Sequence, residues 1–237
     1  MAVPLDSIDI ATESVTRLVP RQLDRVLGQL LVPGQVSLIH GPDRSPLTTI
    51  AHAIAVGAVK SGGRSAYLDS GSNYSSALAR ALCNRSGSPE DLLKEIAVGP
   101  VMSLADLEGM VLQVSSMEGI TMVVVDSLTG VLNLTGAPRS KGRQRKLFAT
   151  LEVLRGVVND SNIHLFITDH SARKWNSGIS SPIGGNVIAH GVDSLVRVDR
   201  LAVMEGMFRL EVERSPINPN DKGVIVRIGP SGIRSIK

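Results

Sequence analysis

One stretch of the sequence has the spacing of a phosphate-binding loop but lacks part of its chemistry. A working loop reads G-x-x-x-x-G-K-[ST]: its glycines let backbone N–H groups surround phosphates, and its lysine reaches the β- and γ-phosphate oxygens. Gly41 and Thr48 stand at the first and last of these positions, but Pro46 replaces the second glycine and Leu47 replaces the lysine. Proline supplies no N–H and leucine supplies no charge. Arg44 is the one cation between Gly41 and Thr48; it either replaces the lysine, since guanidinium binds phosphate, or is a solvated loop residue.

Two carboxylates follow apolar runs that have the length of buried strands. Asp126 ends the run 122–126, where the acid of a phosphate-loop enzyme supports Mg²⁺ through water; the alternative is a cap or a turn acceptor. Asp69 ends the run 65–69 and is followed by Ser70 and Gly71, neither of which can act as a base. We therefore predict that Asp69 caps the end of its strand. The candidate nucleotide site comprises Gly41, Arg44, Thr48 and Asp126, with no catalytic residue assigned.

A dense basic segment lies further along the chain. It contains five cations and no acid: Arg139, Lys141, Arg143, Arg145 and Lys146. Such a run is typical of contact with a phosphate backbone, and the alternative is a solvated basic face.

A second candidate contact is the polar stretch 171–186, which we expect to form a long loop after a buried strand. It holds Arg173, Lys174 and Trp175, the only tryptophan of the chain. An aromatic side chain beside cations suits base stacking combined with phosphate contact on single strands. The alternative is that Trp175 packs this loop onto its own domain.

The elements that must position these residues alternate between strand and helix. We expect strands at 36–40, 65–69, 96–99, 122–126 and 163–168, and helices at 48–60, 75–84, 104–117 and 144–159, with another starting after Ser88. Three closely spaced strands follow, at 193–200, 208–214 and 223–228. This order predicts an α/β fold whose mixed sheet is parallel in its centre and extended by antiparallel strands at the carboxyl end.

Composition excludes several classes of protein. The 237 residues suit one core domain at 17–237 behind a polar tail or linker at 1–16, and the net charge is only +3. No apolar run is long enough to span a membrane, and the amino terminus lacks the order of a signal peptide. The single cysteine, Cys83, fits a reducing, cytoplasmic location. The five histidines are dispersed, so no metal site is expected.

Taken together, these residues and their spacing resemble the RecA/RadA recombinase family, most closely its archaeal RadA-like branch and the paralogues of that branch. The resemblance covers residues 17–237. Residues 21–28 look like the segment that leads into the family's core, residues 122–128 like its Walker B strand, and residues 142–147 like the helix start after its first DNA-binding loop. The most specific match, at 181–190, closes the second DNA-binding loop in that family; residues 213–219 look like the cap over a neighbour's ATP.

The resemblance implies a RecA-like fold, assembly into filaments or rings, and ATP bound between subunits. Three positions depart from the family pattern: Leu47 replaces the lysine, Gly71 the catalytic glutamate, and Asp169 with His170 the Asn-Gln pair that senses the γ-phosphate. Groups of this kind stabilise the charge of the transition state by several kcal/mol. We therefore expect no hydrolysis, and no requirement for ATP or Mg²⁺ as cofactors.

The main hypothesis is a catalytically degenerate RadA paralogue that assists homologous recombination or DNA repair. It would bind single-stranded DNA, a RadA-type recombinase or a second copy of itself without hydrolysing ATP, and would have no membrane partner. The first alternative is a divergent DNA-dependent ATPase that uses Arg44, Thr48 and Asp126. The second is a protein scaffold that does not bind DNA.

Overall fold

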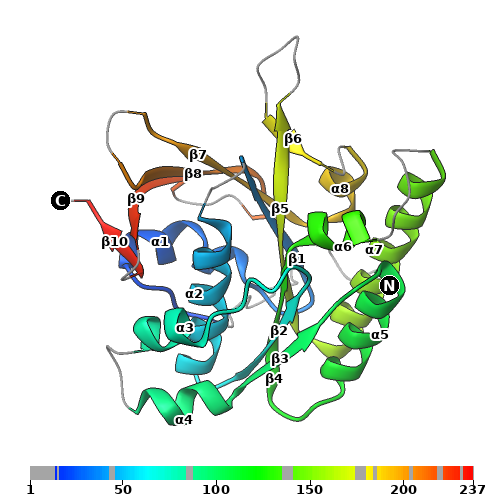
Figure 1. The fold of residues 1–237 in the computed structure, drawn as a ribbon, viewed down its shortest axis with the longest axis horizontal. Coiled ribbons are helices and arrows are strands. Elements are labelled where there is room, and N and C mark those ends of the chain that lie inside the picture. The colour runs from blue at the N-terminus through cyan, green and yellow to red at the C-terminus, as the bar shows by residue number, and fades with distance from the viewer. Residues whose placement is uncertain are drawn as a thin grey trace, which may run out of the picture.

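A mixed sheet of ten strands forms the centre of the part of the chain that the computed structural model describes (Figure 1). The described residues are 14, 16–42, 46–83, 88–134, 141–173, 180–183, 186–202, 205–217, 221–229 and 232–236. The strands are β1 (Val36–Gly41), β2 (Arg64–Asp69), β3 (Ile96–Pro100), β4 (Ile120–Asp126), β5 (His164–Arg173), β6 (Ser180–Pro182), β7 (Ser194–Arg200), β8 (Met207–Arg214), β9 (Gly223–Gly229) and β10 (Gly232–Ser235).

The strand order shows where the parallel and antiparallel parts meet. It reads β10-β9-β8-β7-β1-β5-β4-β2-β3, and β6 pairs with β5 off this path. Neighbours from β7 to β3 run parallel, whereas β7–β8, β8–β9, β9–β10 and β5–β6 are antiparallel. The predicted fold class, a sheet parallel in its centre with an antiparallel carboxyl-terminal extension, is therefore confirmed.

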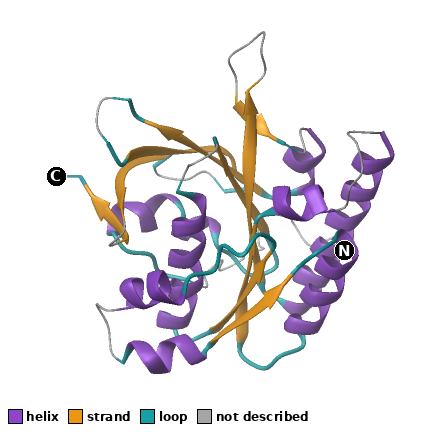
Figure 2. Ribbon diagram, viewed as in Figure 1, coloured by secondary structure: helices purple, strands orange, loops and turns teal. Residues whose placement is uncertain are grey.

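Helices cover both faces of the sheet (Figure 2). They are α1 (Arg21–Val26), the 3₁₀ turn η2 (Gly28–Leu30), α2 (Leu47–Lys60), α3 (Ser76–Cys83), α4 (Pro89–Lys94), α5 (Leu104–Ser115), α6 (Leu128–Leu134), α7 (Lys141–Ser161) and α8 (Asn186–Gly191). No helix in these described ranges combines the length and the apolar character needed to cross a membrane.

The alternation of side chains along β4 explains the two layers. Met122 and Val124 belong to an apolar cluster with α1, α2 and α3, whereas Val123 and Val125 belong to a second cluster with α5 and α7. Because successive side chains of a strand point to opposite faces, a central strand that is covered on both sides must be apolar throughout. This is why the Walker B-like run reads as a continuous apolar stretch ending in one acid.

The predicted loop at 171–186 is wrong in three places. Its first residues extend β5 to Arg173, residues 180–182 form β6, and α8 begins at Asn186. Backbone pairing of Ser171 with Pro182 and of Arg173 with Ser180 closes this hairpin, and polar side chains give no sequence signal for such pairing. Sequence patterns also missed α6 and β10, which are short. Ser88 occupies the N-cap of α4, as predicted, but its side chain makes no capping bond.

The burial of His164 in the core makes stability depend on pH. His164 is fully buried, its Nδ1 lies 2.6 Å from the carbonyl oxygen of Val32, and its Nε2 has no partner among the described residues. Burial lowers its pKa to about 4. Below pH 6.5 the unfolded chain takes up this proton and the folded chain does not, so stability falls as the pH falls towards 4.

We expect the titration of His164 to lower the free energy of unfolding by about 2 kcal/mol when the pH falls from 7 to 4.5. Urea unfolding of the wild type and of His164→Asn at both pH values measures it, because the asparagine amide can keep a bond to Val32 but cannot titrate. The variant should lose about 2 kcal/mol less than the wild type. An equal loss in both proteins would show that other groups carry the pH dependence.

Candidate functional site

The carboxylate of Asp126 lies in a cage of three hydroxyl groups at the carboxyl end of β4. Its Oδ2 accepts from Thr48 Oγ1 at 2.8 Å and from the Tyr67 hydroxyl at 2.6 Å, and its Oδ1 accepts from Thr168 Oγ1 at 2.7 Å. Asp126 is only 2% exposed. A buried carboxylate needs such donors, and here three neutral side chains supply them.

A neutral histidine completes the cage on the side of α2. His52 Nδ1 lies 2.7 Å from the Thr48 carbonyl oxygen and 3.3 Å from the Tyr67 hydroxyl, while Nε2 accepts from the Ser75 N–H at 2.9 Å. These partners place the proton on Nδ1. Burial lowers the pKa of His52, which keeps the ring neutral. Burial, followed by the charge of Asp126, raises the pKa of Tyr67, so its hydroxyl stays protonated and donates to the carboxylate.

The described part of the phosphate loop offers no cation to a phosphate. Leu47, at the position of the lysine, is 3% exposed and belongs to the apolar cluster beneath α2. Gly41 ends β1, and Pro46 stands at the N-cap of α2 without a side-chain capping bond. Thr48 already donates to Asp126. Arg44, the remaining candidate of this loop, lies outside the described residues.

Asp69 is a turn acceptor, as predicted. Its Oδ1 accepts from the N–H groups of Gly71 and Asn73, both at 3.0 Å, and its Oδ2 accepts from the Tyr74 N–H at 2.9 Å. Both carboxylate oxygens therefore fix the turn after β2. This turn carries a glycine at the position where the resemblance implies a catalytic glutamate.

Asp169 connects the end of β5 with two following segments. It is fully buried, accepts from the hydroxyl of Thr129 in α6, and accepts from the Ile183 N–H just after β6 at 3.0 Å. Thr129 in turn accepts from the His170 N–H at 2.9 Å. The pair Asp169 and His170 therefore links α6 to the base of the β5–β6 hairpin.

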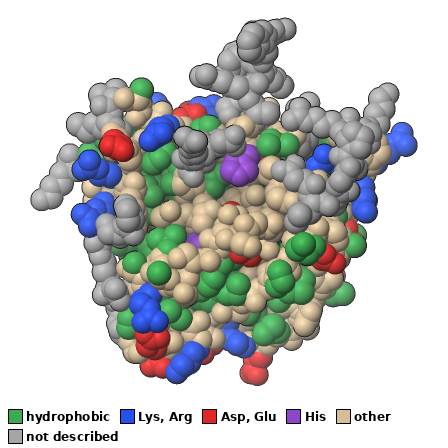
Figure 3. Space-filling model, in the orientation of Figure 1, with side chains coloured by type: hydrophobic (Ala, Val, Ile, Leu, Met, Phe, Trp, Pro, Cys, Tyr) green, Lys and Arg blue, Asp and Glu red, His purple; other side chains and the backbone are tan. Residues whose placement is uncertain are grey.

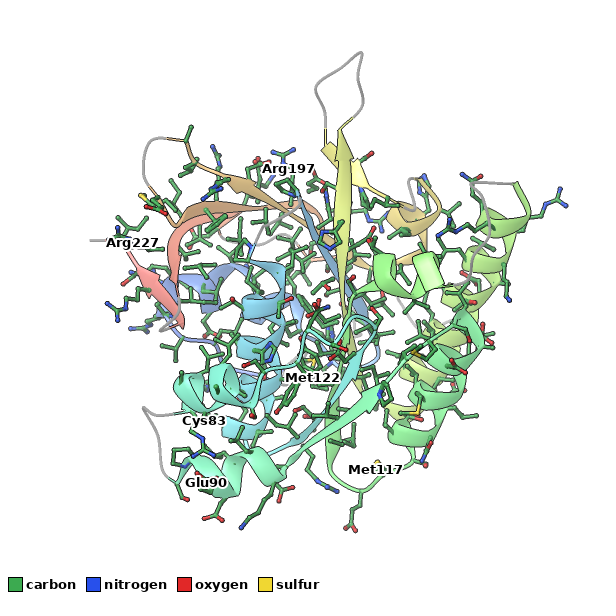
Figure 4. All side chains as sticks on the ribbon, viewed as in Figure 1. Cys83, Glu90, Met117, Met122, Arg197 and Arg227 are labelled. Atoms are coloured by element: carbon green, nitrogen blue, oxygen red, sulfur yellow. The ribbon has the colours of Figure 1, made fainter. Side chains whose placement is uncertain are left out.

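A second buried histidine joins β1 to β5 and β8. His40 Nδ1 lies 2.8 Å from Ser171 Oγ, and its Nε2 lies 3.0 Å from Glu213 Oε2. Burial lowers the pKa of His40, against the opposing effect of Glu213. Arg197, labelled on β7 in Figure 4, binds Glu213 at 3.0 Å and also Asp199 and Glu211, each at 2.8 Å. The end of β1, where the phosphate loop starts, is thereby tied to β8 at Glu213, the first residue of the cap-like segment 213–219.

The cations of the basic segment differ in exposure and in the contacts that they make. Arg145 and Lys146 are exposed in the first turns of α7, where Lys and Arg side chains gather at the upper right of Figure 3. Arg143 is half-buried, and its Nη2 donates to the Leu132 carbonyl oxygen of α6 at 2.5 Å, so it holds two helices together. Only the backbone is described for Lys141 and Arg173. Three candidates fall outside the described residues: Arg139, Lys174 and Trp175.

Sequence patterns singled out Thr48 and Asp126, which the structure joins by a hydrogen bond, but they missed the residues that surround this pair. Tyr67, Thr168 and His52 come from three other places in the chain, and each looks like an ordinary strand or helix residue. No motif spacing relates them, because the contacts exist only once β2, β4 and β5 lie side by side.

The cage yields a stability prediction. We expect Tyr67→Phe to lower the free energy of unfolding by about 2 kcal/mol, because Asp126 loses a donor while it remains buried. Tyr74→Phe is the matched control, since no hydrogen bond is found for its hydroxyl within the described ranges; its effect should be about 0.5 kcal/mol or less. Denaturant unfolding at pH 7 measures both, and equal effects would contradict the assigned bond.

Comparisons with known proteins agree with this architecture. The sequence model of the Rad51 family matches residues 9–235. The DNA repair protein RAD51 of Mycosarcoma maydis is 25% identical over 234 residues, which cover 90% of this chain and 67% of that protein. The DNA repair and recombination protein RadB of Thermoplasma acidophilum is 24% identical over 215 residues, which cover 89% of this chain and 90% of that protein.

The fold is also that of a solved relative. The crystal structure of the RadB recombinase aligns with a TM-score of 0.74 at 22% identity and covers 92% of this chain and 97% of that one. This likeness confirms the predicted RecA-like fold. Because the family match extends over nearly the whole sequence, the resemblance to RecA/RadA recombinases is confirmed as well: the chain belongs to the Rad51 family.

Proposed function

We propose that this protein is a Rad51-family accessory factor that binds single-stranded DNA, alone or together with a recombinase, without hydrolysing ATP. Its role is to assist homologous recombination or DNA repair. The observation that carries the proposal is the burial of Leu47, which is 3% exposed at the position where the family uses a lysine. A side chain that packs the core beneath α2 cannot reach a phosphate.

Two further positions support the loss of hydrolysis. Gly71 has no side chain to orient a water molecule. The carboxylate of Asp169 already accepts hydrogen bonds from the Thr129 hydroxyl and the Ile183 N–H. An acid at that point would also repel a γ-phosphate. The hydroxyl cage of Asp126 explains how the site stays folded without a nucleotide, because each carboxylate oxygen has a partner.

The DNA-binding part of the proposal rests on charge and position. Arg145 and Lys146 are exposed at the start of α7, and the segment from Arg139 to Lys146 contains no acid. The hairpin of β5 and β6 points from the same end of the sheet (Figure 1), and β5 ends at Arg173. Lys174 and Trp175 follow Arg173 in the sequence. Cations at one end of a sheet suit a phosphate backbone.

The role in recombination rests on the relatives. RAD51 of Mycosarcoma maydis is named as a DNA repair protein, and RadB of Thermoplasma acidophilum as a DNA repair and recombination protein. A family member that has the fold and a dense basic segment but no lysine in the phosphate loop fits an auxiliary place in the same process. Its partner would be a RadA-type recombinase or a second copy of this chain.

Binding should be salt-dependent. If five basic side chains each contact one phosphate, the logarithm of the affinity for single-stranded DNA should fall with the logarithm of salt at a slope of about −3.5. The double variant Arg145→Gln, Lys146→Gln removes two of these charges, so the slope should become shallower by about 1.4. Fluorescence anisotropy of a labelled oligonucleotide at several salt concentrations measures both slopes.

The control for that experiment is Lys94→Gln. Lys94 is exposed on α4, at the opposite end of the sheet in Figure 1, and should leave the slope unchanged. A wild-type slope near zero would reject the electrostatic part of the proposal. Absence of any binding would favour the protein scaffold.

ATP should make no difference to binding, and the protein should release no phosphate. We expect equal affinities with and without Mg-ATP, because the described loop has no cation for the triphosphate. Phosphate release is measured with and without single-stranded DNA, with a hydrolysing recombinase as the positive control. Release above the buffer rate, or binding that appears only with ATP, would support the divergent ATPase that uses Arg44, Thr48 and Asp126.

A further inference from the structure

A shallow hollow lies between the start of α7 and the start of α8. Its volume is about 420 Å³, and it is lined by Gln144, Arg145, Phe148 and Val187. Phe148 is the aromatic side chain that lines this hollow, and it is 49% exposed. A phenylalanine left half in water forgoes much of the stabilisation that burial would give, so its surroundings need an explanation.

The helical period of α7 shows that Phe148 is not a core residue. Leu147, Leu151, Leu154 and Val158 form the buried stripe of the helix against the sheet. Phe148 lies beside that stripe on the outer side, one turn after Arg145. The aromatic ring and the guanidinium group therefore share one face of α7.

The hollow is also where the two proposed DNA-binding segments end. The basic segment runs into the first turn of α7, and the chain after the β5–β6 hairpin runs into α8. The helices pack closely because Gly191 has no side chain: a Cβ there would lie 2.7 Å from Leu151 Cδ1. This packing brings Val187 to the edge of the hollow beside Phe148.

We propose that Phe148 stacks on a base of single-stranded DNA while Arg145 binds an adjacent phosphate. The inference rests on the proposed DNA binding and assigns a contact within it. A nucleotide presents a flat apolar ring and an anion, and this hollow presents an exposed aromatic ring and a cation. Stacking of bases on aromatic side chains tolerates any sequence, since every base has a π-face.

The surrounding charge favours a nucleic acid over a protein surface as the occupant. Arg145 and Lys146 are exposed beside Phe148, and the segment 139–146 to which they belong carries five cations without an acid. The acid Glu152 comes only one turn beyond Phe148, on the side away from the basic end. A strong positive field at the rim of an aromatic site complements a phosphate backbone.

The test compares two strands and four proteins. The strands are a labelled oligothymidylate and a strand of equal length whose residues are abasic, so that only the first offers rings for stacking. The proteins are the wild type, Phe148→Ala, Phe148→Trp and Val153→Ala. Val153 is the matched control, because it is 47% exposed on the same helix but does not line the hollow.

We expect Phe148→Ala to weaken binding of oligothymidylate by about tenfold, the loss of one base–aromatic stack. It should leave the affinity for the abasic strand and the salt slope unchanged, because the phosphate contacts remain. Phe148→Trp should restore binding of oligothymidylate, and Val153→Ala should match the wild type on both strands. A further strand that contains the fluorescent base 2-aminopurine tests stacking directly. The proteins should quench its fluorescence on binding, with the exception of Phe148→Ala.

Two results would overturn the inference while the proposed DNA binding stands. In one, Phe148→Ala binds oligothymidylate as the wild type does, or weakens both strands equally. In the other, it changes only the oligomeric state measured by light scattering, which would assign the hollow to a second copy of the chain. If the wild type binds neither strand, the proposed function itself fails, and this outcome is distinguishable from both.

Discussion

The buried carboxylate of Asp126 is the constraint on which the centre of this protein depends. A carboxylate that is 2% exposed is costly to bury unless its oxygens accept hydrogen bonds. The donors here are Thr48 from α2, Tyr67 from β2 and Thr168 from β5. One acid thus fixes the helix after the phosphate loop against two neighbouring strands through three hydroxyl groups.

Other buried polar side chains at the carboxyl ends of the parallel strands are also paired by hydrogen bonds. Asp169 secures α6 and the base of the β5–β6 hairpin, and His40 connects β1 to Ser171 and Glu213. These polar groups are buried and paired, so each reduces the freedom of the segment that follows it. If the proposed function holds, the basic segments are attached to strand ends and helix starts that these bonds fix in place. Such a rigid attachment suits side chains that must be held in position to contact DNA.

Charge is distributed unevenly between the two candidate sites. The nucleotide side has a buried leucine at position 47 and a glycine at position 71, whereas the start of α7 has exposed Arg145 and Lys146. In the proposed role, the protein contacts the phosphates of a nucleic-acid backbone and does not depend on those of a nucleotide. Phe148 would add a contact to bases that depends on neither ATP nor metal.

The alternation of strands and helices, the mixed sheet and the family could be predicted from the amino-acid sequence, because they follow from local periodicity and from motifs with fixed spacing. The sequence also singled out Thr48 and Asp126, which lie in hydrogen-bond contact, and the capping role of Asp69. The tertiary structure alone decided the partners of Asp126, the helix-linking bond of Arg143, and the hairpin and helix within 171–186. Contacts of this kind join residues far apart in the chain, so no local pattern contains them. The exposure of Phe148 is likewise a property of the packed helices, since its side chain alone predicts a core residue.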